Sequence, residues 1–297
     1  MRAHLADFDV ACPATLDEAL TFLAAGATRP GGVTPLAGAT DVYVPFAAGF
    51  VAPTTFMSLH AVAEFRAPAR WEGGAYVMGP LTTYTDCRRD PRVARELPLL
   101  VAAARELGAL QIQNRGTWAG NVANASPAAD GVPVLLAYDA TLELTSVRGR
   151  RTVALAEYFT GYKTSVRAAD ELITAIIVPV PRAASGAPPL RHFFRKVGTR
   201  RLQAISKVVA AGLIERDAAG VVKRARLALG SVAPTTVRAR AVEAAITGRV
   251  LDVAAAEAAA AAVAKDIAPI DDVRSTRAYR ARIAAGLARA FAAPDPA

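Results

Sequence analysis

Cysteine and histidine are scarce in this 297-residue chain, which narrows the chemistry that it can perform. Its two cysteines, Cys12 and Cys87, are too few to make a structural zinc site or to hold an iron–sulfur cluster. They do not form a C-x-x-C pair, so we expect two reduced thiols. The three histidines, His4, His60 and His192, lie far apart and match no H-E-x-x-H pattern. Since G-x-S-x-G is also missing, we predict no metal site and no catalytic residue.

Long apolar runs and an export signal are missing as well. No continuous apolar run reaches the roughly 18–20 residues that a membrane-spanning helix needs. The N-terminal sequence MRAHLADFDVACP contains two aspartates and has no apolar signal core. The sequence therefore predicts a cytoplasmic protein with no integral membrane segment.

The charge balance is basic, but it is not arranged as in nucleic-acid-binding proteins. The formal net charge is +9, and the basic residues are scattered in short groups such as VRGRR and RKVGTRR. No helix-turn-helix, RNP or zinc-finger signature occurs. We therefore do not expect a nucleic-acid partner, although a basic nucleic-acid or scaffold-binding module remains an alternative. A basic surface equally suits an acidic protein partner or an anionic cofactor.

The first sixty residues predict a small α/β unit. ATLDEALTFLAAG, residues 14–26, has apolar residues at helical spacing, with Thr15 as the N-cap and a glutamate three positions later. Residues 31–38 and 53–60 have the composition of short buried strands, the first ending in a turn. A helix between strands of this length is typical of an α/β arrangement.

Residues 61–182 predict a larger unit of strands and helices. Strands are expected at 75–82, around 141–146 and at 171–181, where prolines end the last one. DPRVARELPLLVAAARELG reads as helix on both sides of Pro98, with Asp90 as the cap. By contrast, QIQNRGTWAGNVANASPAADG, residues 111–131, shows neither helical nor strand periodicity.

The last part of the chain predicts a separate α+β domain. RAASGAPP, residues 182–189, is the best linker in the sequence, so we expect domains at 1–182 and 183–297, the first divided near residue 60. Beyond the linker, the pattern predicts three strands and then three helices with apolar faces. The expected strands are 191–198, 206–216 and 221–232, and the expected helices are 237–248, 252–267 and 275–293.

Two glycine-containing segments have the composition of an anion-binding loop. They are PLAGATD, residues 35–41, and RGTWAGN, residues 115–121. Small residues let backbone N–H groups approach a ligand oxygen, and successive amides in such turns attract phosphate. Thr40, Thr117 and Asn121 can add side-chain donors. Neither segment is a Walker or Rossmann motif, so a nucleotide or dinucleotide ligand and two plain turns both remain open at this point.

The pair of loops, in this order and about eighty residues apart, resembles the FAD-binding (medium) subunits of the molybdenum hydroxylases, which include carbon monoxide dehydrogenase and xanthine dehydrogenase-type enzymes. The family patterns are A-G-G-[TH]-[DS] and R-N-x-G-T-[IL]-G-G-N-[IL]-x-x-A-[SD]-P-x-x-D. Here AGATD and NRGTWAGNVANASPAAD stand in their places. FFRKVGTRRLQAISKVVAAG and STRAYRARIAAGLARAF are similar to parts of the family's C-terminal domain. The resemblance therefore covers nearly the whole chain.

The resemblance implies a PCMH-type FAD-binding domain of two α/β subdomains, followed by a C-terminal domain with a three-stranded antiparallel sheet and a three-helix bundle. It implies FAD between the two subdomains, with its pyrophosphate on the two glycine loops. Asp130 would contact the ribose or adenosine end, and Ile173 and Lys196 would pack on or reach toward the flavin or adenine. The implied cofactor-binding residues are Ala37, Gly38, Ala39, Thr40, Asp41, Thr117, Trp118, Ala119, Gly120, Asn121, Asn124, Asp130, Ile173 and Lys196.

Three residues depart from the family pattern. Ala39 and Ala119 stand where the family has glycine, and each adds a methyl group where backbone is expected to meet phosphate. Alanine adopts a positive φ only at a cost. Trp118 replaces a medium-sized aliphatic residue and would either stack near the flavin or fill the core.

The function implied by the resemblance is electron transfer within a larger enzyme. A molybdopterin subunit would hydroxylate the substrate, and a separate [2Fe–2S] subunit would pass electrons to FAD on this chain. From there they would go to NAD⁺ or another external acceptor. The scarcity of cysteine agrees with clusters on another subunit. The alternative enzyme is a stand-alone flavin oxidoreductase with a vanillyl-alcohol oxidase-like fold.

Overall fold

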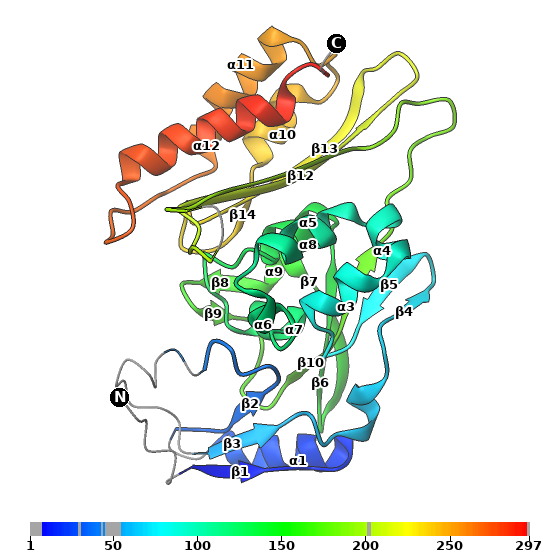
Figure 1. The fold of residues 1–297 in the computed structure, drawn as a ribbon, viewed down its shortest axis with the longest axis vertical. Coiled ribbons are helices and arrows are strands. Elements are labelled where there is room, and N and C mark those ends of the chain that lie inside the picture. The colour runs from blue at the N-terminus through cyan, green and yellow to red at the C-terminus, as the bar shows by residue number, and fades with distance from the viewer. Residues whose placement is uncertain (1–7, 29–30, 43, 45–54, 201–202, 296–297) are drawn as a thin grey trace.

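The computed structural model describes residues 8–28, 31–42, 44, 55–200 and 203–295. Three units follow one another along its long axis (Figure 1). The N-terminal unit lies at one end, a mixed sheet-and-helix unit lies in the middle, and the C-terminal sheet and helices lie at the other end. Among the helices of the described residues, none combines the length and apolar composition required to cross a membrane.

The N-terminal unit is a three-stranded parallel sheet with one helix. Its strand order is β1–β3–β2, with the bounds β1 Asp9–Ala11, β3 Thr55–Ser58 and β2 Thr34–Leu36. Helix α1, Leu16–Gly26, begins where Thr15 accepts a hydrogen bond from the Glu18 amide at 3.2 Å. Its apolar face packs on the sheet, where Leu23 and Met57 are fully buried. Both the cap and the helix agree with the prediction from the sequence.

The middle unit is a five-stranded antiparallel sheet covered by short helices. Its strand order is β4–β5–β10–β6–β7, and β10 lies at the centre. The bounds are β4 Arg70–Glu72, β5 Ala75–Met78, β6 Thr141–Ser146, β7 Gly149–Ala154 and β10 Leu172–Pro179. Helix α4, Pro91–Glu96, begins at Asp90, whose carboxylate accepts from two backbone amides. Pro98 then starts α5, Pro98–Glu106, because proline fits the first helical turn.

Short elements complete the middle unit. They are α3 Tyr84–Arg89, α6 Leu110–Gln113, α7 Trp118–Ala123, α8 Val132–Ala137, α9 Leu155–Tyr158, and the hairpin of β8 Phe159–Gly161 and β9 Thr164–Ser165. The short helix η1, Ala63–Arg66, instead packs through Phe65 in the core of the N-terminal unit. Helices α6 and α7 fall inside the segment 111–131, which showed no periodicity in the sequence. Each is a turn or two long, so neither repeats an apolar face often enough for the pattern to be seen.

The C-terminal unit is a sheet buried on both faces. Its strands are β11 Arg191–Val197, β12 Val208–Arg216, β13 Val222–Gly230 and β14 Val237–Arg238, all antiparallel in that order. The prediction of three strands is therefore wrong by one, because the two-residue β14 is too short to leave a period-2 pattern. Helices α10 Arg240–Ile246, α11 Val253–Ala262 and α12 Arg277–Ala292 follow, with η2 Val263–Lys265 between the last two.

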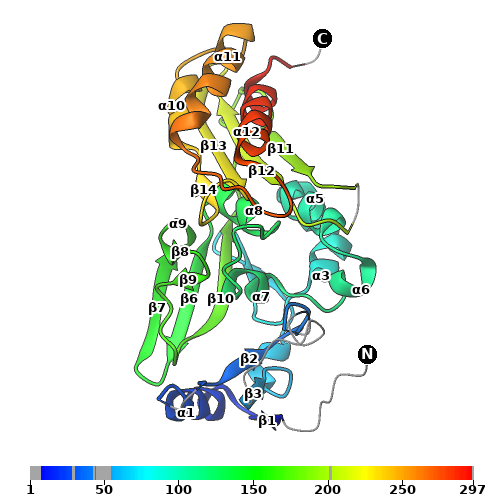
Figure 2. The same cartoon turned by 90° about the vertical axis from the view of Figure 1, so that its left-hand side faces the viewer.

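Residues of β12 alternate between two cores. Val208 and Ala210 pack with the C-terminal helices, whereas Val209 and Ala211 join the core of the middle unit. On the face of the sheet toward the middle unit, helix α8 contacts β12 and β13, and helix α5 contacts β11; both helices lie beside the sheet in Figure 2. Gly212 permits the first packing, because an added Cβ would lie 2.5 Å from the ring of Phe291 in α12. The C-terminal sheet is thus the layer that joins the two larger units.

Candidate functional site

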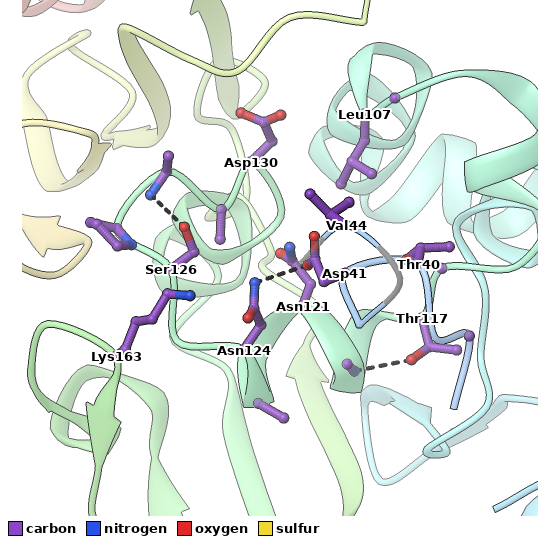
Figure 3. A pocket seen from close by; sticks show the side chains of 18 of the residues that line it. Thr40, Asp41, Val44, Leu107, Thr117, Asn121, Asn124, Ser126, Asp130 and Lys163 are labelled. Atoms are coloured by element: carbon purple, nitrogen blue, oxygen red, sulfur yellow. Dashed lines mark hydrogen bonds between the residues drawn. The ribbon is translucent and has the colours of Figure 1, made fainter. Parts of the chain in front are cut away.

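A cavity of about 1200 Å³ opens where the three units meet. Its wall is built from the loop after β2, the segment 107–130, the β8–β9 hairpin, the start of β10 and residues of the C-terminal unit. Figure 3 shows side chains from these segments pointing toward one space, among them Asp41, Asn121, Asn124 and Lys163. The cavity therefore collects residues that are far apart in the chain.

The two glycine loops predicted from the sequence touch each other at this cavity. A Cβ added to Gly38 would lie 1.9 Å from the carbonyl oxygen of Arg115 and 2.9 Å from the Cα of Gly116. Side-chain atoms essentially never come this close to backbone, so the two loops can meet only if residue 38 is glycine. Residues of both loops, among them Gly38 and Gly116, line the cavity.

Ala39 has a left-handed backbone, with φ at +57°. This conformation places Cβ close to the following carbonyl, which costs roughly 1–2 kcal/mol for a residue other than glycine. The family pattern has glycine here, so the chain keeps the geometry of the loop while carrying the strain of alanine. Ala39 also lines the cavity.

Helix α7 begins at the second loop. The Thr117 hydroxyl caps it by accepting from the Gly120 amide at 3.0 Å, and an added Cβ on Gly120 would come within 2.9 Å of that oxygen. Ala119 lies inside this helix and is not among the residues with positive φ in the described chain. The methyl group of Ala119 therefore does not strain the backbone, contrary to the expectation from the sequence.

Trp118 is a core residue and does not line the cavity. Its side chain is fully buried, and its ring centroid lies 5.0 Å from that of Tyr84. Gly131 lies against the indole, since an added Cβ would meet it at 3.1 Å. Of the two roles considered for this side chain, the structure supports filling the core, and the implied contact of Trp118 with a cofactor has no place in the lining of the cavity.

The first loop is tied to the end of α7 by side chains. The Asn124 amide donates to Asp41 Oδ2 at 2.9 Å, and the bond is drawn in Figure 3. Partial burial raises the pKa of Asp41 above its ordinary value, while the charge of Lys163 and the bond from Asn124 oppose that rise. Lys163 extends from the β8–β9 turn, so a cation and a carboxylate face one another near the two loops.

Asp130 lies at the far side of the cavity and is almost completely buried. Its carboxylate accepts from the Lys196 ammonium at 2.6 Å and from the Ser206 hydroxyl at 2.5 Å. Burial raises the pKa of Asp130, and the two bonds oppose the rise. Lys196 also donates to the Glu106 carbonyl at 3.0 Å and does not line the cavity. The resemblance implied that Lys196 reaches toward the flavin or adenine. In the structure its ammonium group pairs with Asp130 instead, outside the lining of the cavity.

All the other predicted site residues line the cavity, namely Ala37, Gly38, Ala39, Thr40, Asp41, Thr117, Ala119, Gly120, Asn121, Asn124, Asp130 and Ile173. Sequence reasoning missed Leu107, Lys163 and Ser206, which also line it. Lys163 belongs to no motif in the sequence, and none marks the hairpin that carries it. Backbone donors, amide side chains and apolar surface are thus brought together in one place, which suits an extended anionic ligand with a flat apolar end.

Two family models match the chain. The model described as the FAD-binding domain in molybdopterin dehydrogenase matches residues 6–181. The model described as the CO dehydrogenase flavoprotein C-terminal domain matches residues 193–294. Together they cover most of the chain.

Individual proteins and solved structures agree with these models. The xanthine dehydrogenase FAD-binding subunit of Escherichia coli O157:H7 is 32% identical over 82% of this chain and 82% of its own length. The nicotine 6-hydroxylase medium subunit of Paenarthrobacter nicotinovorans is 35% identical over 70% of this chain and 71% of its own length. A chain of the carbon monoxide dehydrogenase from Hydrogenophaga pseudoflava superposes with a TM-score of 0.85 at 28% identity, covering 95% of both chains.

Proposed function

The chain belongs to the family of FAD-binding subunits of molybdopterin dehydrogenases, and from that premise we propose that it transfers electrons within such a complex. It is an oxidoreductase subunit with FAD as its cofactor. In the proposal, a molybdopterin-binding large subunit oxidises the substrate, and a [2Fe–2S] small subunit delivers the electrons to this chain. The chain then passes them to NAD⁺ or another external acceptor.

The residues of the cavity fit FAD. Thr40, Thr117 and Asn121 line the cavity and supply hydroxyl and amide groups for a pyrophosphate, and Gly38 lets the two loops meet there. Ala39 holds its N–H in a turned backbone of the kind that binds anions. Apolar side chains such as Leu107 and Ile173 also line the cavity and can pack on a flat ring. The single observation that carries the proposal is the contact of the two glycine loops at one cavity.

The chain and the cofactor divide the work. When bound, FAD supplies the redox chemistry, accepting and releasing electrons. The residues of the chain bind it, orient it and hold water away from part of it. Ile173 is 7% exposed and lies at the start of the central strand β10, so its side chain is held by the sheet on which it is built. A flavin or adenine ring packed against Ile173 would therefore meet a rigid surface.

The proposed partners follow from what the chain does not carry. The chain has two cysteines, too few for the four thiolates of a [2Fe–2S] cluster, and Cys87 is buried while Cys12 is exposed. They cannot ligate one cluster, so the iron–sulfur centre of the proposed electron path belongs to a partner subunit.

The two family models support the proposed domain boundary at 182–183. The match to the first model ends at residue 181, and the match to the second begins at residue 193.

The variant Gly38→Ala tests the proposed site. The added methyl group must push the two loops apart, because the Arg115 carbonyl lies in its place. We expect the purified variant to lose most of its FAD, measured as the ratio of flavin to protein absorbance, and to keep the far-UV circular dichroism of the wild type. Gly286→Ala is the matched control, since its added methyl group meets nothing within 4 Å and lies on an exposed part of α12.

Equal flavin content in Gly38→Ala and wild type would refute the assignment of FAD to these loops. The partner proposal needs its own measurement. Co-expression with the proposed partners, a molybdopterin-binding large subunit and a [2Fe–2S] small subunit, should give a complex that contains molybdenum, iron and flavin. A chain that oxidises a substrate unaided, without such partners, would instead support a stand-alone flavin oxidoreductase.

A further inference from the structure

We infer that the C-terminal unit shapes the cofactor cavity through a relay of buried hydrogen bonds that ends on Asp130, with Ser206 and Arg280 as positioning residues. The inference rests on the proposed binding of FAD in this cavity. It adds a role for the C-terminal unit that none of the cavity motifs implies, since both glycine loops lie in the first 182 residues.

The relay begins at the wall of the cavity. Asp130 closes the segment 124–130, which carries Asn124 at its other end. Ser206, which is 1% exposed and precedes β12, donates its hydroxyl proton to Asp130 Oδ1 at 2.5 Å. The Lys196 ammonium from β11 holds the other oxygen at 2.6 Å. Both oxygens of the carboxylate are therefore held by residues of the C-terminal unit.

Ser231, at the end of β13, makes the second contact with the same segment. Its amide donates to the Pro127 carbonyl at 2.7 Å, and its hydroxyl donates to the Ser206 carbonyl at 2.9 Å. It does so from a left-handed backbone with φ at +65°, a conformation that costs energy for serine. Both the backbone amide and the side-chain hydroxyl of Ser231 make hydrogen bonds in this contact. Several bonds that fix one residue can hold it in a strained conformation.

Arg280 connects the relay to helix α12. Its side chain is 5% exposed, and Nη1 donates to the Ser231 carbonyl at 2.8 Å and to the Lys207 carbonyl at 2.9 Å. Asp272 accepts from Nη2 at 2.8 Å and balances the charge. The guanidinium thus holds together the two strand ends that carry Ser206 and Ser231. Displacing it would loosen both of their contacts with the cavity wall.

The consequence is that segment 124–130 is held from both sides. Asn124 bonds to Asp41 in the first glycine loop, and Asp130 bonds to the C-terminal unit. A cofactor that bridges the two loops meets a wall whose far end is set by Ser206. Loss of the Ser206 hydroxyl removes one support of Asp130 and should therefore shift segment 124–130. We expect this shift to weaken FAD binding, although the side chain of Asp130 is kept.

The experiment compares Ser206→Ala with Ser185→Ala, an exposed serine of the linker, in the full chain. FAD dissociation constants are measured by titrating the apoprotein and following flavin fluorescence. Loss of a hydrogen bond to a charged group predicts about tenfold weaker binding for Ser206→Ala, and no change for Ser185→Ala. Ser206→Thr, which keeps the hydroxyl, should restore most of the affinity.

A double-mutant cycle separates positioning from direct contact. If Ser206 acts through Asp130, Ser206→Ala adds no further loss in an Asp130→Ala background, where no side-chain acceptor is left at residue 130, whereas additive losses overturn the inference. Amide hydrogen exchange gives a readout that does not need FAD: segment 124–130 should exchange faster in Ser206→Ala than in Ser185→Ala. Unchanged exchange, or an unchanged FAD affinity, overturns the inference and leaves the proposed function standing. A wild-type chain that binds no FAD overturns both.

Discussion

Ala39 is a residue at which the chain carries backbone strain within its candidate site. Its φ is +57°, where glycine is at ease and alanine is not. Replacing it by glycine relieves roughly 1–2 kcal/mol of strain and loses roughly 0.4–1 kcal/mol through the freer unfolded chain. We therefore expect Ala39→Gly to stabilise the protein by about 0.5–1 kcal/mol, measured as a higher midpoint of urea unfolding.

The control for this prediction has the opposite sign. Ala254 is an exposed residue of helix α11, so Ala254→Gly should destabilise the chain by about 1 kcal/mol. A loss of stability in both variants would mean that the strain at Ala39 is already relieved by its surroundings. FAD affinity can be measured on the same samples, because Ala39 lines the cavity.

The two cysteines, Cys87 and Cys12, differ in burial and therefore in the reactivity of their thiols. Burial raises the pKa of Cys87 to about 12, and its sulfur lies in the core beside Tyr76 and Met78. Cys12 is exposed. Because the thiolate is the reacting form, we expect a thiol reagent at pH 8 to label one cysteine per native chain and two after denaturation. Rapid labelling of both in the native protein would contradict the burial of Cys87.

At the scale of elements, the pair Glu171–Arg151 joins the start of β10 to β7 beside the cavity. Arg151 donates to both carboxylate oxygens, at 2.6 Å and 2.8 Å, and the Ala168 amide adds a third bond at 2.8 Å. Glu171 is 4% exposed. The bonds from Arg151 hold the pKa of Glu171 below its ordinary value. The charged form therefore stabilises the fold.

The pH dependence follows from the sign of that shift. A carboxylate with a lowered pKa contributes stability above its unfolded pKa of about 4.3, and the contribution is lost as the pH falls through the folded pKa. We expect Glu171→Gln to cost about 1–3 kcal/mol at pH 7 and progressively less below about pH 4.3. Glu157→Gln, at an exposed site, is the control. A cost for Glu171→Gln that stays constant with pH would contradict the assignment.

Elements with strong local signals were predictable from the sequence, and short ones were not. The caps at Thr15 and Asp90 follow from side-chain chemistry that needs no tertiary contact. Helix α7 is six residues long, and β14 has two residues, so both depend on what packs around them. The hairpin that carries Lys163 was missed for the same reason. The site was therefore predictable at its glycine loops and not at the side chains that approach from other units.

At the scale of the molecule, contacts between distant segments complete the site. Loops near residues 38 and 116 meet backbone to backbone, and Asp130 pairs with Lys196 across 66 positions of the chain. No local pattern encodes such a pairing. Most of the residues implied by the resemblance to a family line one cavity, because relatives share the same three-dimensional contacts. The exceptions are Trp118, whose side chain is buried in the core, and Lys196, which pairs with Asp130, since a sequence pattern gives a position along the chain and not the direction of a side chain.

A second set of charges joins the middle and C-terminal units away from the cavity. Asp139, after α8, accepts from Arg226 Nε at 2.6 Å and from Arg238 Nη1 at 2.6 Å. Both arginine side chains are less than 10% exposed, whereas Asp139 is 47% exposed. Arg238 also pairs with the buried Glu243, so Arg226 depends most on Asp139. The backbone of Asp139 is left-handed, with φ at +52°, which asparagine tolerates as well.

The variant Asp139→Asn should therefore remove the charge with little change in shape. It leaves a buried guanidinium without its carboxylate, for which the cost of a broken buried pair, discounted for the half-exposed partner, is about 2 kcal/mol. Since this pair lies on the face of the C-terminal sheet that packs on the middle unit, we expect the loss to separate the unfolding of the two units in calorimetry. Glu257→Gln, which breaks an exposed pair with Arg289 in the C-terminal helices, should change little. A single transition in Asp139→Asn at the wild-type temperature would contradict this, and would show that the apolar contacts of β12 and the bonds around Asp130 couple the units without the charge of Asp139.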